Sequence, residues 1–178
     1  RQSILLRVMP GVDAHTHAHT TTGTLDSKFG LPLATGQADE AMRMALASRF
    51  LRLRGLHFHL GSPLFQLEPY AAAIEIVLAF AARYREEGLD LQELSPGGGF
   101  AIAYTRDQHP PSIAEYAETI VSAIRQGCDS YGFSMPRIAV EPGRAIVGPA
   151  GVALYTVGAI KEILGVRTFA SVDGGMGD

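Results

Sequence analysis

The stretch LRGLHFHL (residues 53–60) is the first part of a strand–helix–strand pattern that indicates the fold. Its residues alternate as in a strand, residues 67–87 then repeat apolar side chains at helical spacing, and a strand pattern at 91–94 leads into PGGGF. A helix that joins two strands in this way is typical of a right-handed βαβ unit. The stretch therefore predicts neighbouring parallel strands in an α/β fold.

The same alternation extends outward in both directions. Strands are expected at 4–8 and 137–140, and helices at 38–51 and 112–130, with Ser112 as a cap and a loop rich in Gly and Thr before Gly36. Four such units predict about the second half of a (β/α)8 barrel over residues 1–148. Residues 149–178 are rich in β-branched and aromatic side chains, which favours the start of a β-rich second domain.

Composition excludes several classes of protein. The 178 residues are 47% hydrophobic and 19% charged with a net charge of -3, which is typical of a soluble globular protein and gives no positive field for nucleic acid. The apolar runs are too short to span a membrane. The single cysteine, Cys128, cannot form an internal disulfide, which fits a cytoplasmic location. Because strand patterns lie close to both ends, the chain is expected to be part of a longer protein.

A run of histidines raises the question of a metal site. His15, His17 and His19 alternate behind Asp13, and on an extended strand they would share one face, as in the metal-dependent amidohydrolases. The Thr and Gly content of the following residues favours a loop, which would remove that alignment. Later strand ends also lack the further ligands that such an enzyme needs, so no metal is expected.

Two motifs fall at the ends of predicted strands, where barrels carry their working residues. Gly97, Gly98 and Gly99 let backbone N–H groups approach an anion, although an isolated run of glycines is more often a flexible turn. Glu141 ends the next strand and is expected to be partly buried. Its partner is either Arg144, in a structural ion pair, or a protonated ring nitrogen of a cofactor, with Arg144 left free for phosphate or carboxylate.

Two histidines end the 53–60 strand. Their alternation with Phe58 predicts that His57 and His59 share one face of the sheet. His57 is as readily a core histidine with satisfied hydrogen bonds as a functional group. His59 lies next to a Gly-Ser turn and is the better candidate to stack on a flat ring, while the Ser62 hydroxyl is a candidate phosphate ligand.

Six motifs in one order carry a resemblance to a known family. They are LRVMPGVDAHTHAHTTTG (6–23), DSKFGLPL (26–33), GLHFHLGSP (55–63), PGGGFAIAY (96–104), EPGRAIVGPAG (141–151) and VDGGMGD (172–178). Together they resemble the diaminopimelate decarboxylases, which are pyridoxal-phosphate enzymes with the alanine-racemase-like fold. In that family the His15–His17 segment is part of a signature after a barrel strand, so the resemblance also implies no metal.

The resemblance implies a role for each matching residue. His59 would stack on the pyridoxal ring and Glu141 would face its nitrogen, so both are expected to be catalytic. Lys28 would lie near the barrel mouth, where relatives approach a second subunit. Arg144 would also bind a substrate carboxylate. The cofactor-binding residues would be His59, Ser62, Gly97, Gly98, Gly99, Glu141, Pro142, Gly143 and Arg144.

The activity implied by the resemblance is the decarboxylation of meso-2,6-diaminopimelate to L-lysine and CO2, with pyridoxal 5'-phosphate as cofactor, in a homodimer. The Schiff-base lysine would precede Arg1, so the chain by itself is expected to be inactive. Pro63, Ser95–Pro96 and Gly177 depart from the usual pattern. Three alternatives stay open: a related decarboxylase for ornithine, arginine or carboxynorspermidine, a non-catalytic relative that binds a partner protein, and the amidohydrolase.

Overall fold

The computed structural model describes residues 1–13 and 28–175. The chain forms two compact units, Arg1–Gly148 and Pro149–Asp178. In the first unit the strands are β1 (Gln2–Met9), β2 (Leu31–Pro32), β3 (Leu51–His57), β4 (Glu93–Gly98) and β5 (Arg137–Glu141). The helices are α1 (Gln37–Ala47), α2 (Glu68–Ala82), α3 (Ile113–Tyr131) and the short α4 (Gly143–Val147), followed by a 3-10 turn at Gly148–Ala150.

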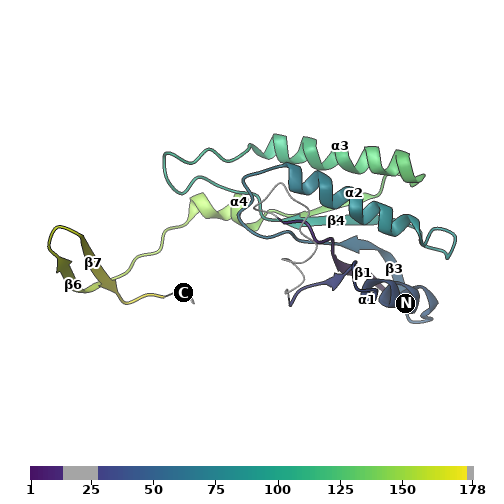
Figure 1. Ribbon diagram of the computed structural model, residues 1–178, viewed down its shortest axis with the longest axis horizontal. Coiled ribbons are helices and arrows are strands. Elements are labelled where there is room, and N and C mark those ends of the chain that lie inside the picture. The colour runs from purple at the N-terminus through teal and green to yellow at the C-terminus, as the bar shows by residue number, and fades with distance from the viewer. Residues whose placement is uncertain (14–27, 176–178) are drawn as a thin grey trace. The chain divides into compact units, whose positions relative to one another are not determined.

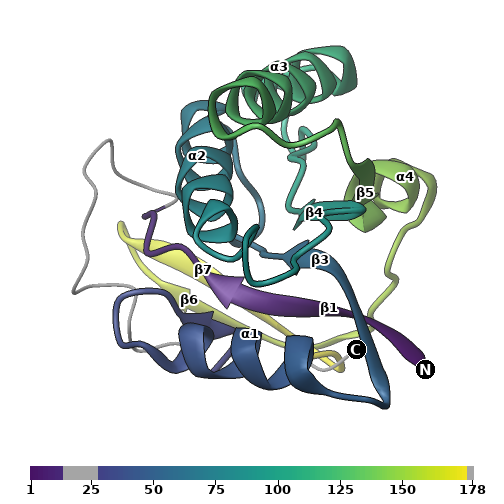
Figure 2. The ribbon, with the colours of Figure 1, turned by 90° about the vertical axis from the view of Figure 1, so that its right-hand side faces the viewer.

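The five strands form one parallel sheet in the order β2-β1-β3-β4-β5. Strands β3, β4 and β5 follow one another across the sheet, with α2 between β3 and β4 and α3 between β4 and β5 along the chain (Figure 2). The predicted α/β class with parallel strands is therefore confirmed. Because all strands are parallel, their carboxyl ends meet at one edge of the sheet.

Helices α2 and α3 lie side by side in both ribbon views (Figures 1 and 2). The start of α3 is determined by a capping box: the Ser112 hydroxyl accepts a hydrogen bond from the Glu115 N–H (3.3 Å), and the Glu115 carboxylate accepts one from the Ser112 N–H (2.7 Å). Gly132, in a left-handed conformation (φ 69°), ends the helix. The predicted cap at Ser112 is confirmed.

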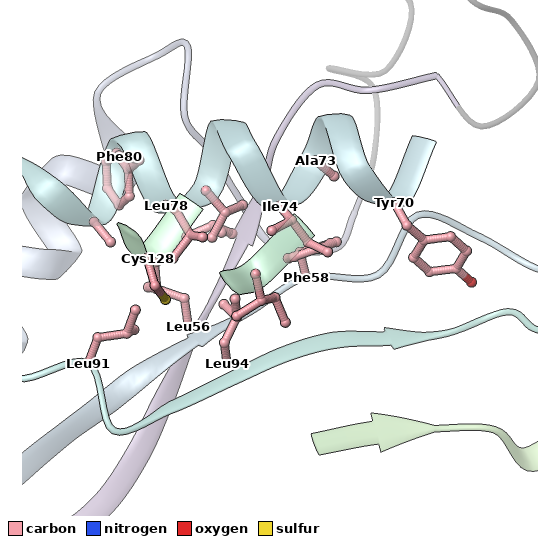
Figure 3. Packing of buried hydrophobic residues seen from close by; sticks show 14 of the residues in the cluster. Leu56, Phe58, Tyr70, Ala73, Ile74, Leu78, Phe80, Leu91, Leu94 and Cys128 are labelled. Carbon is pink, nitrogen blue, oxygen red and sulfur yellow. The ribbon is translucent and has the colours of Figure 1, made fainter. Parts of the chain in front are cut away.

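The buried core of this unit joins the sheet to α1, α2 and α3, and one part of it lies between the sheet and α2. Leu56 and Leu94 come from β3 and β4, and Ile74 and Leu78 come from α2; all four are fully buried. Figure 3 shows these side chains packed together, with Cys128 of α3 among them. Burial of four such side chains contributes on the order of 6 kcal/mol or more to the hydrophobic free energy of folding. This packing fixes the position of the carboxyl edge of the sheet.

Two predicted helices are shorter than expected. The helix predicted at 38–51 ends at Ala47, because the Ser48 hydroxyl accepts hydrogen bonds from the N–H groups of Phe50 and Leu51 and turns the chain into β3. The helix predicted at 67–87 ends at Ala82, and residues 83–88 form turns. Helical spacing of apolar residues continues through such turns, so periodicity alone overestimates helix length.

The strands also differ from prediction in their ends. The strand predicted at 53–60 occupies 51–57, and the one predicted at 91–94 occupies 93–98, so that it includes Gly97 and Gly98. The pairing of β4 with β5 shifts register between Leu94 and Gly97. Such an irregularity changes the local direction of the strand, here next to the candidate site. A two-residue strand, β2, lies in the stretch that was predicted to be entirely loop.

In the second unit, β6 (Val157–Ile163) and β7 (Arg167–Val172) form an antiparallel hairpin. Gly165 adopts a left-handed conformation (φ 72°) in the turn between them, which a residue with a side chain rarely adopts. Across the described residues of both units, no helix combines the length and apolar content that a membrane span requires.

Candidate functional site

A hollow of about 410 Å³ opens beside the carboxyl ends of β1 and β3. Two of its lining residues, Arg7 and His59, carry ionisable side chains, and the others are apolar or glycine. The lining residues are Arg7, Val8, Met9, Phe29, His59, Leu60 and Gly61. The hollow therefore lies where the parallel sheet brings its strand ends together.

His59 lies two residues after the end of β3 and is held by a backbone group of β4. Its Nδ1 accepts a hydrogen bond from the Gly98 N–H at 3.1 Å, so the neutral ring carries its proton on Nε2. Burial, and next the positive charge of Arg7, lower the pKa of His59 below its ordinary value, while Glu141 acts in the opposite direction. Near neutral pH the structure therefore presents a neutral, oriented imidazole.

The three glycines are buried and closely packed, so the interpretation of a flexible turn is wrong. A Cβ on Gly97 would lie 2.6 Å from the carbonyl oxygen of Phe58, and one on Gly98 would lie 2.0 Å from that of Glu141. A Cβ on Gly99 would lie 2.1 Å from a backbone oxygen as well. The glycines are thus required for the close approach of β4 to its neighbours, whether or not an anion binds. The Gly98 N–H already has a partner in His59.

Two buried tyrosines hold the same backbone from the helix side. The Tyr70 hydroxyl of α2 donates to the Gly98 carbonyl at 2.7 Å. The Tyr116 hydroxyl of α3 donates to the Leu64 carbonyl and accepts from the Ala101 N–H at 3.1 Å. Burial raises the pKa of Tyr70 well above its ordinary range, so its hydroxyl stays a donor. Sequence reasoning missed both, although a hydroxyl on an apolar helix face is a signal for a buried hydrogen bond.

Two strand ends form the two rims of the candidate site. The glycine rim is Gly97–Gly99 at the end of β4, and the acidic rim consists of Glu141 at the end of β5 and the residues that follow it, up to Arg144. The Glu141 side chain is 57% exposed in this chain, where β5 lies at the edge of the described sheet, so it is covered less than the prediction of partial burial implied. Pro142 precedes α4, and Gly143 and Arg144 form its first turn. The Glu141 carboxylate forms no ion pair with Arg144 in the described structure; its Oε1 lies 2.9 Å from His57 Nε2 instead.

Arg144 has a partner of its own. Its guanidinium contacts the Tyr104 hydroxyl and lies 5.5 Å from the centre of the Tyr104 ring. Among the described residues Arg144 thus does not form the predicted structural ion pair with Glu141, and its binding of an anion stays a prediction. Tyr104 is 61% exposed, so the contact is accessible to solvent.

Arg7 was not among the residues predicted for the site. It pairs in register with His57 across β1 and β3, and it lines the hollow with His59. A charged residue inside the apolar strand Gln2–Met9 was the signal that could have identified it.

The remaining predicted residues contribute little to the described geometry. Ser62 is exposed in the loop after β3. Lys28 is exposed, with its Nζ 5.2 Å from the ring centre of Phe29, which lines the hollow. His15, His17 and His19 fall outside the described residues, and among those that are described no group of three His, Cys, Asp or Glu residues could hold a metal ion.

Comparison with known proteins gives consistent matches. The family model described as "Pyridoxal-dependent decarboxylase, pyridoxal binding domain" matches residues 1–148. The diaminopimelate decarboxylase of Bacillus subtilis (strain 168) is 44% identical over 176 residues, which are 98% of this chain and 40% of that protein.

Solved structures agree with the sequence matches. The diaminopimelate decarboxylase from M. jannaschii in co-complex with L-lysine aligns with a TM-score of 0.80 at 33% identity, over 99% of this chain and 40% of the other. The enzyme from Helicobacter pylori complexed with L-lysine aligns with a TM-score of 0.75 at 32% identity, over 99% and 41%.

The chain thus spans about 40% of the length of the curated relatives it matches. The resemblance inferred from the six motifs is confirmed by these matches, and so is the expectation of a pyridoxal cofactor. The chain belongs to the pyridoxal-dependent decarboxylases, and its residues 1–148 match their pyridoxal-binding domain.

Proposed function

We propose that residues 1–148 form the cofactor-binding part of a (β/α)8 barrel, that residues 149–178 begin a C-terminal β domain, and that the whole protein is a diaminopimelate decarboxylase. One observation carries the proposal: His59, the glycine segment and Glu141 lie at the carboxyl edge of one parallel sheet, and His59 also lines a hollow of about 410 Å³. This edge is where barrel enzymes carry out their chemistry.

The residues present fit pyridoxal 5'-phosphate. Its flat ring needs an apolar or aromatic surface, and His59 offers a neutral imidazole at the wall of the hollow. Its phosphate needs donors, and Arg144 and the exposed Ser62 hydroxyl are available for this role. Its ring nitrogen needs an acidic partner. Glu141 can take this role because its carboxylate forms no ion pair with Arg144.

When bound, pyridoxal phosphate supplies a ring that accepts the electrons left on the substrate Cα as CO2 departs. Three residues of the chain would assist that chemistry by binding and orienting the cofactor or the substrate. Glu141 would hold a proton at the ring nitrogen, since a carboxylate next to a protonated nitrogen stabilises its charge. His59, oriented by Gly98, would pack on the ring and restrict its orientation. Arg144 is placed to bind a carboxylate or phosphate oxygen.

The substrate proposed is meso-2,6-diaminopimelate, and the products are L-lysine and CO2. The relatives that support this assignment are named diaminopimelate decarboxylases, and both aligned structures described above are complexed with L-lysine. We propose a homodimer, as the resemblance implies. A cytoplasmic location fits the one cysteine, Cys128, which is free and buried.

The test uses a protein of the relatives' length that carries this chain. It should release lysine from meso-diaminopimelate in the presence of pyridoxal phosphate, and Glu141→Gln should reduce the rate by roughly 100-fold or more, on the scale of a lost general acid–base group. A matched control is His109→Gln, in an exposed loop, which should leave the rate unchanged. Product from ornithine or arginine instead of diaminopimelate would contradict the substrate assignment.

A further inference from the structure

His57 occupies a position between two charged groups. It pairs in register with Arg7 of β1 on one side, and its Nε2 lies 2.9 Å from Glu141 Oε1 on the other. Its side chain is 14% exposed. The nearly buried imidazole therefore contacts a carboxylate to which the proposed function assigns the ring nitrogen of the cofactor.

The contact spans two steps of the sheet. His57 is on β3 and Glu141 is on β5, with β4 between them. Adjacent strands are about 4.8 Å apart, so the two backbones are separated by roughly 10 Å, and both side chains must extend across β4 to meet. On β4, His57 pairs with Ser95 and Glu141 pairs with Gly98, two small residues that leave room above the strand.

His57 is not a core histidine with satisfied hydrogen bonds. Its Nε2 is buried and has no partner with hydrogen-bond geometry among the described residues, although Glu141 is within ion-pair distance. A buried N–H without an acceptor is unfavourable, because burial removes its hydrogen bond to water. The Glu141 carboxylate is the acceptor within reach, and a small rotation of either side chain completes the bond.

We propose that His57 is a positioning residue for Glu141. It donates from Nε2 to one carboxylate oxygen and so directs the other oxygen toward the cofactor's ring nitrogen. Without this contact, a side chain that is 57% exposed would sample many rotamers and be solvated by water. The inference rests on the proposed function, because it assigns the target of Glu141, and it adds a residue for which the family resemblance implied no role.

The test measures binding of pyridoxamine 5'-phosphate, which cannot react with surface lysines, and of its 1-deaza analogue, in which carbon replaces the ring nitrogen. Binding is followed by calorimetry on this chain and on the full-length protein freed of cofactor. We expect His57→Ala to weaken pyridoxamine phosphate by roughly tenfold, the size of one hydrogen bond to a charged group, and to leave the deaza analogue unchanged. His57→Gln, whose amide can donate from nearly the same place, should restore most of the affinity.

Three controls make the outcome specific. His109→Ala, in an exposed loop, should change neither affinity. In a Glu141→Gln background, His57→Ala should add no further loss for pyridoxamine phosphate. Thermal unfolding of each variant identifies any that fail to fold. If His57→Ala does not fold, the affinities of His57→Gln and Glu141→Gln are compared instead.

The possible results separate this inference from the proposed function. Equal losses of pyridoxamine phosphate and its deaza analogue in His57→Ala would show a general structural effect and overturn the inference, as would no loss for either. In both cases the proposed function would still be supported, because the wild-type protein would bind pyridoxamine phosphate. Failure of the wild-type protein to bind pyridoxamine phosphate at all would contradict the proposed function and the inference together.

Discussion

The two rims of the site are built in different ways. The glycine rim, Gly97–Gly99, is buried and fixed by the backbone oxygens of its neighbours and by the Tyr70 hydroxyl. On the acidic rim Glu141 is exposed and Arg144 is half-buried, and their side chains contact His57 and Tyr104 respectively.

This difference separates two kinds of requirement. On the glycine rim, an added Cβ atom would clash with backbone oxygens of the neighbouring segments. Substitutions there are therefore expected to lower the stability of the fold. On the acidic rim, a change removes a side-chain contact at the solvent-exposed end of β5, so the expected effects are on ligand binding. Substitutions on each rim can therefore test whether the contrast is real.

The largest effect is expected from Gly98→Ala. Its new Cβ would lie 2.0 Å from the Glu141 carbonyl oxygen, and relief requires β4 and β5 to separate. We expect a loss of roughly 3 kcal/mol in the free energy of unfolding, at the upper end for overpacking. Urea denaturation followed by circular dichroism measures it.

A matched glycine on the acidic rim provides the control. Gly143→Ala has no heavy atom within 4 Å of its new Cβ and lies in the first turn of α4. Its stability should stay the same or rise by up to about 1 kcal/mol, because alanine favours helix. Equal losses for Gly98→Ala and Gly143→Ala would contradict the contrast between the rims.

Tyr70→Phe should have the next largest effect. It removes the donor to the buried Gly98 carbonyl, with an expected loss of about 1–2 kcal/mol in unfolding free energy, measured by urea denaturation. The control is Tyr131→Phe on α3, whose hydroxyl donates to the Glu75 carboxylate at 2.5 Å in an exposed contact, and its stability should stay close to that of the wild type. A larger loss in Tyr131→Phe would show that Tyr70 does not hold the glycine rim.

The lowered pKa of His59 predicts that the stability of the fold depends on pH. Because its pKa in the folded chain lies below the ordinary 6.5, the folded state binds fewer protons than the unfolded state, and stability should decrease as the pH falls below about 6.5. His59→Asn retains an acceptor for the Gly98 N–H without titrating, so its stability should decrease less over the same range. NMR titration of the His59 ring should give a midpoint below 6.5; a midpoint above it would contradict the neutral, acceptor form.

The smallest effect is expected from Tyr104→Phe. The ring that lies beside the Arg144 guanidinium remains, and only an exposed hydroxyl contact is lost. The free energy of unfolding should change by less than about 0.5 kcal/mol. Affinity for pyridoxamine phosphate should change by roughly twofold, measured by calorimetry; a loss as large as that from Arg144→Ala would show that the Tyr104 hydroxyl itself binds the ligand.

The parallel α/β class was predictable because the spacing of apolar residues reports secondary structure directly. Ser112 could be identified as a cap from its side-chain chemistry alone. The ends of the helices after Ala47 and Ala82 could not be predicted, because turns stabilised by local hydrogen bonds continue the same apolar spacing.

The candidate site was only partly predictable for a related reason. Motifs locate the strand ends and so identify His59, Gly98 and Glu141, but they do not report which side chains meet across the sheet. The contact of His57 with Glu141 depends on the small residues of β4 and on the register shift beyond Leu94. The exposure of Glu141 in this chain was not predicted, because a flanking apolar sequence does not report that β5 lies at the edge of the sheet that these residues form.

The most direct test is an amide NMR titration of this chain with pyridoxamine 5'-phosphate. If both rims hold one ligand, the resonances of Gly97–Gly99, His59 and Gly143–Arg144 should shift together with a single saturating dissociation constant. Shifts confined to one rim, or to residues far from the strand ends of β3, β4 and β5, would contradict the account.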